Sequence, residues 1–295
     1  MGDQRVQTKR EIEEILEKAG VRPRRRFGQH FLIDGNLIRR LVASAQLQPQ
    51  DVVLEVGAGT GGLTDLLAWA AARVICVEID RTLQGILAER FRDVASVTLV
   101  AGDVLENKHR LSQAVAELLN AARPEAGGSL KLVANLPYQV ATPVLMDLLL
   151  DYPRVRRFCF TVQAEVGERI LSPPGRKAYG PLGIFSQLLC ECHVVARIKP
   201  DAFWPKPQVA SLMIRMDVKE PAPFGTREEI GRFAELVRKT FEHRRKTLRS
   251  ALRYVLDDEQ RERICRVVDG NRRPESFSVA EWLQIFEEQV NSGAV

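Results

Sequence analysis

The first half of the chain alternates between short apolar runs and segments of helical periodicity, and this alternation constrains the fold more than any other feature. Apolar residues fill each run almost continuously, as in strands that are buried on both faces of a sheet. A helix between successive strands requires crossover connections, so the strands should lie parallel with helices on both faces. The sequence therefore predicts a doubly wound α/β core. The expected strands are residues 52–56, 74–79, 97–100 and 130–134.

The second half of the chain ends this alternation. A proline-bearing stretch at residues 220–225 has the composition of a linker, and only helical patterns follow it. At 295 residues the chain is long enough for one large core and a smaller appendage. We expect two domains, residues 1–219 with the sheet and residues 220–295 as a small all-helical domain. Three late strands are expected at residues 158–162, 194–199 and 209–218, the last two as an antiparallel pair at the sheet edge.

The composition is that of an ordinary globular protein, with 45% hydrophobic and 27% charged residues. No apolar run approaches the ~20 residues that cross a bilayer, and the first residues lack the apolar core of a secretory signal. We therefore expect a cytoplasmic protein that needs no membrane. The five cysteines lack the paired spacing of a zinc site, so we expect reduced thiols and no metal. We also expect a monomer.

Basic residues form two clusters in a chain of net charge +5. Two separated clusters indicate a long polyanion that is held at two points. For either cluster taken alone, a solvated helix face is the alternative. The residues that we expect to contact this polyanion are Arg24, Arg25 and Arg26 near the start, and Arg244, Arg245, Lys246 and Arg249 near the end.

A glycine-rich loop directly follows the first expected strand. Gly57, Gly59 and Gly62 match a pattern of dinucleotide-binding enzymes, but S-adenosylmethionine also contains adenosine and would use the same loop. Glu78 ends the second strand and can accept both ribose hydroxyls. Asp103 after the third strand and Glu55 before the loop add negative charge, which suits a sulfonium ligand better than a pyrophosphate. The residues favour S-adenosylmethionine, with a nicotinamide cofactor as the alternative.

A short motif, Asn135-Leu136-Pro137-Tyr138, follows the fourth expected strand. An amide side chain can hydrogen-bond the exocyclic amine of a planar base, and an aromatic ring can stack on its face. Asn and Pro are also ordinary turn residues, so the motif taken alone favours a simple turn. Its position beside a nucleotide loop favours chemistry on a nitrogen.

Further motifs stand in one order along the chain: Phe27-Gly28-Gln29-His30-Phe31-Leu32, Leu54-Glu55-Val56-Gly57, Val77-Glu78-Ile79-Asp80, Gly102-Asp103, Phe203-Trp204-Pro205-Lys206-Pro207, and Phe241-Glu242-His243-Arg244-Arg245-Lys246-Thr247-Leu248. Together with the asparagine motif they resemble the ribosomal RNA adenine N6,N6-dimethyltransferases of the small ribosomal subunit, over most of the chain. The resemblance implies a mostly parallel Rossmann-like methyltransferase sheet and a small C-terminal all-helical domain. It also implies S-adenosylmethionine as methyl donor, and small-subunit ribosomal RNA or the assembling 30S subunit as partner.

The resemblance also implies the site residues. The cofactor contacts are expected at Gln29, His30, Leu32, Gly57, Gly59, Glu78, Ile79, Asp103, Val104 and Asn135. The catalytic residues are expected to be Asn135, Leu136, Pro137, Tyr138 and Phe203, with Tyr138 and Phe203 holding the target adenine.

Three positions depart from the pattern of the family. His30 stands where Asn is usual, and Gln208 and Ala210 stand where Lys and Asp are usual. We expect His30 to be a partly buried hydrogen-bonding residue without a role in proton transfer. The segment of residues 107–129 is also longer than is typical.

The expected activity is dimethylation of N6 on two adjacent adenosines near the 3′ end of 16S ribosomal RNA, in the biogenesis of the small subunit. The Asn135 side-chain oxygen and a carbonyl of Leu136 or Pro137 would accept the N–H hydrogens of the amine, so that its lone pair points to the methyl group. Alignment then supplies most of the rate, without a strong base. The alternatives are a large-subunit ribosomal RNA methylase of the macrolide-resistance type and a non-catalytic ribosome assembly factor.

Overall fold

The computed structural model describes residues 6–24, 28–108 and 110–290, and packing divides them into two compact units. The first unit runs to Gly167 and resumes over Cys192–Val218. The second unit takes Glu168–Glu191 and the residues from Lys219 onward. Residues 168–191 thus group with the C-terminal helices although no linker composition marks them. The domain boundary expected between residues 219 and 220 stays a prediction.

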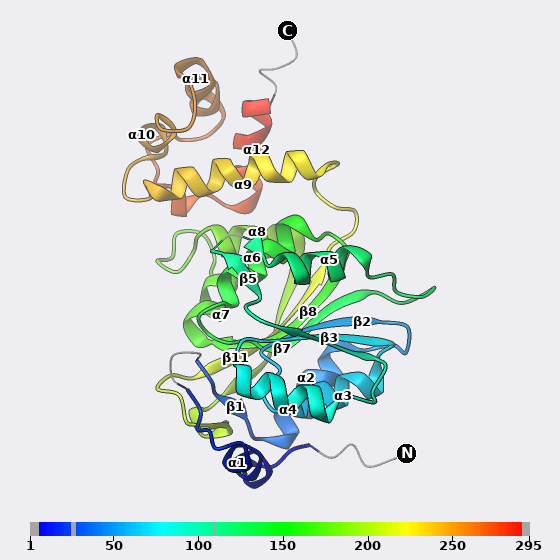
Figure 1. The fold of residues 1–295 in the computed structure, drawn as a ribbon. Coiled ribbons are helices and arrows are strands. Elements are labelled where there is room, and N and C mark those ends of the chain that lie inside the picture. The colour runs from blue at the N-terminus through cyan, green and yellow to red at the C-terminus, as the bar shows by residue number, and fades with distance from the viewer. Residues whose placement is uncertain (1–5, 25–27, 109, 291–295) are drawn as a thin grey trace. The chain divides into compact units, whose positions relative to one another are not determined.

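A seven-stranded sheet runs through the first unit (Figure 1). The strand order is not the chain order, which means that crossover connections join the strands. In the order of the sheet, the strands are β4 (Val97–Ala101), β3 (Arg73–Glu78), β2 (Val52–Val56), β7 (Leu130–Asn135), β8 (Val155–Gln163), β11 (Ser211–Val218) and β9 (Cys190–Ile198).

The pairing within the sheet confirms the predicted fold class. Strands β4, β3, β2, β7 and β8 are parallel to one another, and β11 is antiparallel to β8. Every residue of β2 is buried, as the continuous apolar run required. The two late strands at the edge are neighbours in the sheet, as expected. Parallel strands end at one edge of a sheet, so the loops after β2, β3, β4 and β7 meet there.

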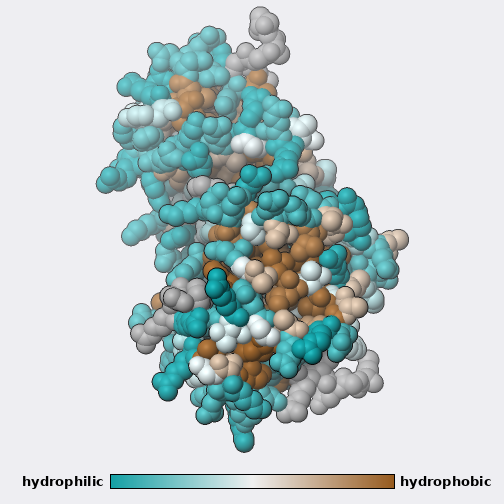
Figure 2. All heavy atoms as spheres, in the orientation of Figure 1, coloured by the Kyte–Doolittle hydropathy of each residue, from teal (hydrophilic) through white to brown (hydrophobic). Residues whose placement is uncertain are grey.

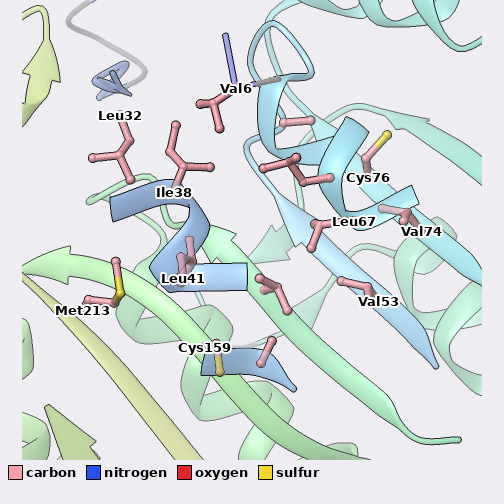
Figure 3. Close-up of a cluster of buried hydrophobic side chains, with 14 of the residues drawn as sticks. Val6, Leu32, Ile38, Leu41, Val53, Leu67, Val74, Cys76, Cys159 and Met213 are labelled. Atoms are coloured by element: carbon pink, nitrogen blue, oxygen red, sulfur yellow. The ribbon is translucent and has the colours of Figure 1, made fainter. Parts of the chain in front are cut away.

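Helices cover both faces of this sheet, and Figure 1 shows α2, α3 and α4 on one side and α5 and α6 on the other. Figure 3 shows the packing beneath the first group, where Leu41, Val53, Leu67 and Val74 meet with none of their surface exposed. Burying such side chains stabilises the fold by ~1.5–3 kcal/mol each. The helices are α2 (Gly35–Ala45), α3 (Gly62–Ala70), α4 (Arg81–Arg90), α5 (Gln113–Ala121) and α6 (Ala141–Asp151).

Helices build the second unit around an aromatic core. Phe233, Phe277 and Trp282 are fully buried, and Phe224 and Phe286 pack edge to face. In the view of Figure 2, hydrophilic residues cover most of the outer surface of this unit. Its helices are α8 (Pro181–Leu189), α9 (Arg227–Glu242), α10 (Leu248–Leu252), α11 (Asp258–Val267) and α12 (Val279–Val290), with a short 3₁₀ turn at Pro274–Ser276.

Several elements escaped the sequence analysis. Helices α6, α7 (Ala164–Leu171) and α8 lie in regions where no helix was expected. Two small sheets were also missed, β1 (Phe31–Leu32) with β10 (Phe203–Trp204) and β5 (Leu105–Asn107) with β6 (Arg110–Leu111). Strands this short show no periodicity. In the ranges that the structure describes, no helix has the length and apolar character to span a membrane.

Candidate cofactor and acceptor site

A pocket opens in the first unit where the loops after β2, β3, β4 and β7 meet. Helix α1 (Lys9–Lys18) and the segment before β1 form its remaining wall, through residues that include Ile12 and Gly28. The structure thus brings together every residue expected to contact the cofactor and most of those expected to act on the acceptor. The predicted residues that line the pocket are Gln29, His30, Leu32, Gly57, Gly59, Glu78, Ile79, Asp103, Val104, Asn135, Leu136, Pro137 and Tyr138.

The backbone of the glycine loop adopts a conformation that is unfavourable for residues with a side chain. Gly57 and Gly59 have φ values of 80° and 62°, in the left-handed region that favours glycine. A Cβ on Gly57 would also come within 2.7 Å of the Pro137 ring. The loop therefore approaches the asparagine motif closely, which places residues expected to contact the cofactor beside residues expected to act on the acceptor.

Glu78 anchors the loop to the end of β3. Its carboxylate accepts the Gly59 N–H at 2.8 Å and the Asp80 N–H at 2.9 Å. Burial, with 5% of the residue exposed, raises the pKa of Glu78 despite these bonds. A carboxylate offers about four lone-pair sites, so the side chain can still accept the two hydroxyls of a ribose.

Glu55 is a second carboxyl group at the pocket, and it is 1% exposed. The Thr64 hydroxyl donates to Glu55 Oε2 at 2.6 Å. Burial raises the pKa of Glu55 to about 8, so this group carries a proton at neutral pH. Glu55 thus presents less negative charge than its sequence implies, and a cationic ligand in the pocket would favour the charged form.

Asp103 is exposed and lies on the pocket wall after β4. Its carboxylate accepts the Leu105 N–H at 2.9 Å, which braces the turn. One oxygen remains available to an adenine amine, so the bracing role and the ligand role are compatible.

The segment before β1 is tied to the loop after β3 through one carboxylate. Gln29 accepts the Arg24 N–H at 2.7 Å and donates to Asp80 at 3.0 Å. The Arg24 guanidinium pairs with the same carboxylate at 3.3 Å. Arg24 is thus partly engaged within the protein, and Gln29 is fixed in the pocket wall. Arg25 and Arg26 lie outside the described residues.

Gln7 is a site residue that the sequence analysis missed. The Thr60 hydroxyl donates to Gln7 Oε1 at 2.6 Å, and Gln7 Nε2 donates to the Thr60 carbonyl at 3.3 Å. Gln7 is 8% exposed and lines the pocket. These contacts hold the glycine loop at Thr60, whereas Glu78 holds it at Gly59. The only available signal was the Thr8 and Glu11 capping box, which marks the start of α1 and so the position of Gln7 before it.

The Asn135 side chain is held from two directions. Its Nδ2 donates to the His30 carbonyl at 2.8 Å, and its Oδ1 accepts the Thr161 hydroxyl. A carbonyl oxygen can only accept, so the contact with His30 fixes which end of the carboxamide is nitrogen. The Asn135 oxygen keeps a second lone pair in a residue that lines the pocket.

Tyr138 stands beside this carboxamide with its hydroxyl 2.8 Å from the Ser211 hydroxyl. Its ring stacks on His30 with 5.5 Å between centroids. His30 Nδ1 lies 2.6 Å from the Pro205 carbonyl, an acceptor, so this nitrogen carries the hydrogen. His30 thus donates to the Pro205 carbonyl and packs against Tyr138, and the expectation that it has no role in proton transfer stays a prediction.

The structure does not bring Phe203 into the pocket. Phe203 is 3% exposed and belongs to the hydrophobic core of the first unit. In the small sheet Phe203 pairs with Leu32, whereas Trp204 pairs with Phe31 and stacks on it. Alternation along a strand sends Phe203 inward with Leu32 and Trp204 to the other side. Phe203 is therefore not among the residues that line the pocket, and its contact with the adenine stays a prediction.

The basic residues of the second unit differ in whether they contact other groups of the protein. Arg244 donates to the Lys177 carbonyl at 3.1 Å, and Arg249 pairs with Glu262 at 2.6 Å. Lys246 contacts Tyr254, and Arg245 is exposed. Among the residues described, no three His, Cys, Asp or Glu side chains gather in a group that could hold a metal ion.

The sheet and its pocket define a methyltransferase that uses S-adenosylmethionine. The family model described as "Ribosomal RNA adenine dimethylase" matches residues 20–290, and the chain belongs to this family. It is therefore a ribosomal RNA methyltransferase, and the cofactor ambiguity of the glycine loop is resolved in favour of the methyl donor.

Curated relatives cover nearly the whole chain. A protein of Moorella thermoacetica named "Ribosomal RNA small subunit methyltransferase A" is 36% identical over 92% of this chain and 94% of its own length. A protein of Bacillus cytotoxicus with the same name is 36% identical over 95% of this chain and 96% of its own length.

Solved structures share the fold. A dimethyladenosine transferase from Plasmodium falciparum superposes with a TM-score of 0.70 at 22% identity, over 90% of this chain and 98% of that one. The 23S rRNA methyltransferase ErmE superposes with a TM-score of 0.62 at 22% identity, over 88% of this chain and 98% of that one.

Proposed function

We propose that this protein dimethylates N6 of two adjacent adenosines near the 3′ end of 16S ribosomal RNA, as part of small-subunit biogenesis. The observation that carries the proposal is the fixed Asn135 carboxamide, which stands with Tyr138 on a pocket wall beside the glycine loop. The names of the curated relatives support the small subunit as the source of the RNA.

The pocket residues fit S-adenosylmethionine. The glycine loop leaves room for an adenosine to approach the backbone, and Glu78 keeps lone pairs for ribose hydroxyls. Asp103 offers an exposed oxygen for the adenine amine, and Glu55 offers a carboxyl group whose ionised form suits a cation. When bound, S-adenosylmethionine supplies the methyl group.

The Asn135 oxygen would act on the nitrogen that receives the methyl group. The lone pair of an adenine N6 amine is delocalised into the ring, which makes the amine a poor nucleophile. A hydrogen bond from N6 to Asn135 Oδ1, supported by a carbonyl of Leu136 or Pro137, would turn the lone pair out of the ring plane. Because Thr161 and His30 already hold the carboxamide, no reorganisation is needed during the reaction.

Tyr138 would provide the surface against which the adenine is held. Reaching N6 in folded RNA requires the base to leave its stack, and stacking on an aromatic ring offsets that cost by ~1–3 kcal/mol. The contacts of Tyr138 with Ser211 and His30 fix its ring at the pocket wall.

The partner in this proposal is small-subunit ribosomal RNA or the assembling 30S subunit, bound by a monomer in the cytoplasm. We assign methyl transfer to residues 1–219 and RNA binding to residues 220–295. The basic residues Arg244, Arg245 and Lys246 support the second assignment, because phosphate contacts supply much of the affinity for RNA.

The test replaces Asn135 with Ala and measures transfer of labelled methyl groups to small-subunit particles. We expect the rate to fall by at least ~100-fold, as for the loss of a fixed polar group that acts in a transition state. RNA binding should stay within about twofold. The matched control is Asn120→Ala, which removes an exposed asparagine on α5 and should leave the rate unchanged.

Three outcomes would contradict the proposal. Retained methyl transfer in Asn135→Ala would remove the carboxamide from the mechanism. Methylation of 23S but not 16S RNA by the unaltered protein would assign it to the large subunit. Normal subunit maturation without any methyl transfer by the unaltered protein would indicate an assembly factor that acts by binding.

A further inference from the structure

An exposed aromatic cluster in the second unit combines His243 and Lys246, from the turn between α9 and α10, with Tyr254, which follows α10. The Tyr254 side chain is exposed, with 56% of the residue accessible. The His243 ring stacks on it with 3.8 Å between centroids and 25° between planes. Lys246 Nζ lies 4.5 Å from the centre of the Tyr254 ring and donates to its hydroxyl.

The backbone holds this cluster in place. The turn after α9 is closed by the Lys246 N–H, which donates to the His243 carbonyl at 2.8 Å. The N-terminus of α10 is tied to another segment, because the Leu248 N–H donates to the Arg272 carbonyl at 2.7 Å. Tyr254 follows α10 and its N–H bonds to the Ala251 carbonyl at 3.2 Å. The rings are thus positioned before any partner arrives.

The cluster is not part of the hydrophobic core of the second unit. The core aromatics Phe233, Phe277 and Trp282 are fully buried, whereas more than half of the surface of Tyr254 is exposed. Single exposed apolar residues are common and need no explanation. Two stacked rings that carry a lysine on their edge are a more specific arrangement.

The charges around the rings indicate the partner. Arg245 lies in the same turn and Arg253 directly precedes Tyr254, and both side chains are exposed. Arg244 and Arg249, by contrast, are engaged by Lys177 and Glu262. An acidic peptide would need only cations to bind and would make no use of the exposed rings. Flat rings beside cations match an unpaired nucleotide, whose base stacks while its phosphate is neutralised.

We propose that Tyr254 and His243, with Lys246, Arg245 and Arg253, form a stacking site for an unpaired base of ribosomal RNA. The inference rests on the proposed function, in which the second unit grips the RNA. The proposal adds a contact with a single-stranded nucleotide to the phosphate contacts through which the second unit would bind RNA.

The test measures binding of the full-length protein to a single-stranded RNA oligonucleotide and to a duplex of the same sequence, at several salt concentrations. Tyr254→Ala should weaken single-strand binding by roughly 5- to 150-fold and leave duplex binding unchanged. The slope of log K against log salt should stay the same, because no phosphate contact is lost. Tyr254→Phe keeps the ring and should bind nearly as well as the unaltered protein.

Two further variants separate stacking from charge. Arg245→Ala should weaken both RNAs and make the salt slope shallower by about one. Trp69→Ala removes another exposed aromatic residue, on α3, and should change neither affinity. Thermal unfolding of each variant should match that of the unaltered protein. Equal loss on both RNAs, a changed salt slope or no loss in Tyr254→Ala would each overturn the stacking site.

Methyl transfer by the unaltered protein tests the proposed function separately from the stacking site. If that protein methylates small-subunit particles and Tyr254→Ala binds single strands as before, only the stacking site fails. If the unaltered protein does not methylate them, the proposed function fails, and the binding data still decide whether the stacking site exists.

Discussion

Each polar side chain that we describe in the pocket is held by a partner that the fold supplies. Glu78 receives two backbone N–H groups, and Asn135 is bonded by His30 and Thr161. The position of Glu78 could be predicted because it depends on local order, a strand followed by a loop. The role of Gln7 could not, because its partner Thr60 is 53 positions away and no local pattern encodes that contact.

The buried carboxyl of Glu55 predicts a pH dependence of stability. The folded protein keeps this proton up to about pH 8, whereas the unfolded chain releases it near the ordinary value of 4.5. Folding therefore takes up a proton between these values, and the free energy of unfolding should fall as the pH rises through this window. The contribution is complete below the ordinary pKa and is lost above the folded one.

Urea unfolding between pH 5 and 9 measures this effect. Glu55→Gln keeps an oxygen for the Thr64 hydroxyl but cannot ionise. The stability of the unaltered protein relative to this variant should decrease from pH 5 to pH 8 and level off above that. Glu106→Gln, at an exposed position, is the control and should run parallel to the unaltered protein. Parallel curves for Glu55→Gln as well would contradict the assignment.

Secondary structure was predictable where an element is long or strongly patterned. Strand β2 has the bounds that its apolar run predicts, and the parallel order follows from the helices between strands. The pair β1 and β10 was not predictable, since two residues show no period and their partners are far apart in the chain. That pair fixes the position of Phe203, and the adenine contact expected of this residue stays a prediction.

The conformation of the glycine loop predicts the effect of a substitution at Gly57. Gly57→Ala introduces a side chain at φ 80° and within 2.7 Å of Pro137. The backbone conformation alone should cost ~1–2 kcal/mol, and the overlap should displace the loop from the asparagine motif. We expect lower stability in urea unfolding and at least ~10-fold weaker binding of S-adenosylhomocysteine in calorimetry.

Gly127→Ala is a matched control for this variant. Gly127 has a φ of 86° but no atom within 4 Å of the added Cβ, so it carries the backbone cost without the overlap. Equal losses of stability in the two variants, with cofactor binding retained in both, would show that the contact with Pro137 has no role.

On the scale of the whole molecule, the chain forms two units with separate cores, and the cofactor pocket lies entirely in the first. Ligands stabilise only the folded region that binds them. S-adenosylhomocysteine should therefore slow amide hydrogen exchange in β2, in β3 and in the segment around Gln7, and leave α9 to α12 unchanged. Exchange followed by mass spectrometry distinguishes this from protection of both units, which would show that the two units are energetically coupled.

The bond between Asn135 and the His30 carbonyl has a consequence for base selectivity. The His30 carbonyl accepts one hydrogen of the amide nitrogen and so fixes the orientation of the carboxamide, whose oxygen remains an acceptor for an incoming base. Adenine presents an N–H donor at its sixth position, whereas guanine presents an oxygen there. On the proposed function, guanine would set two lone pairs against each other. Discrimination between the two purines would thus depend on a backbone carbonyl that orients the carboxamide.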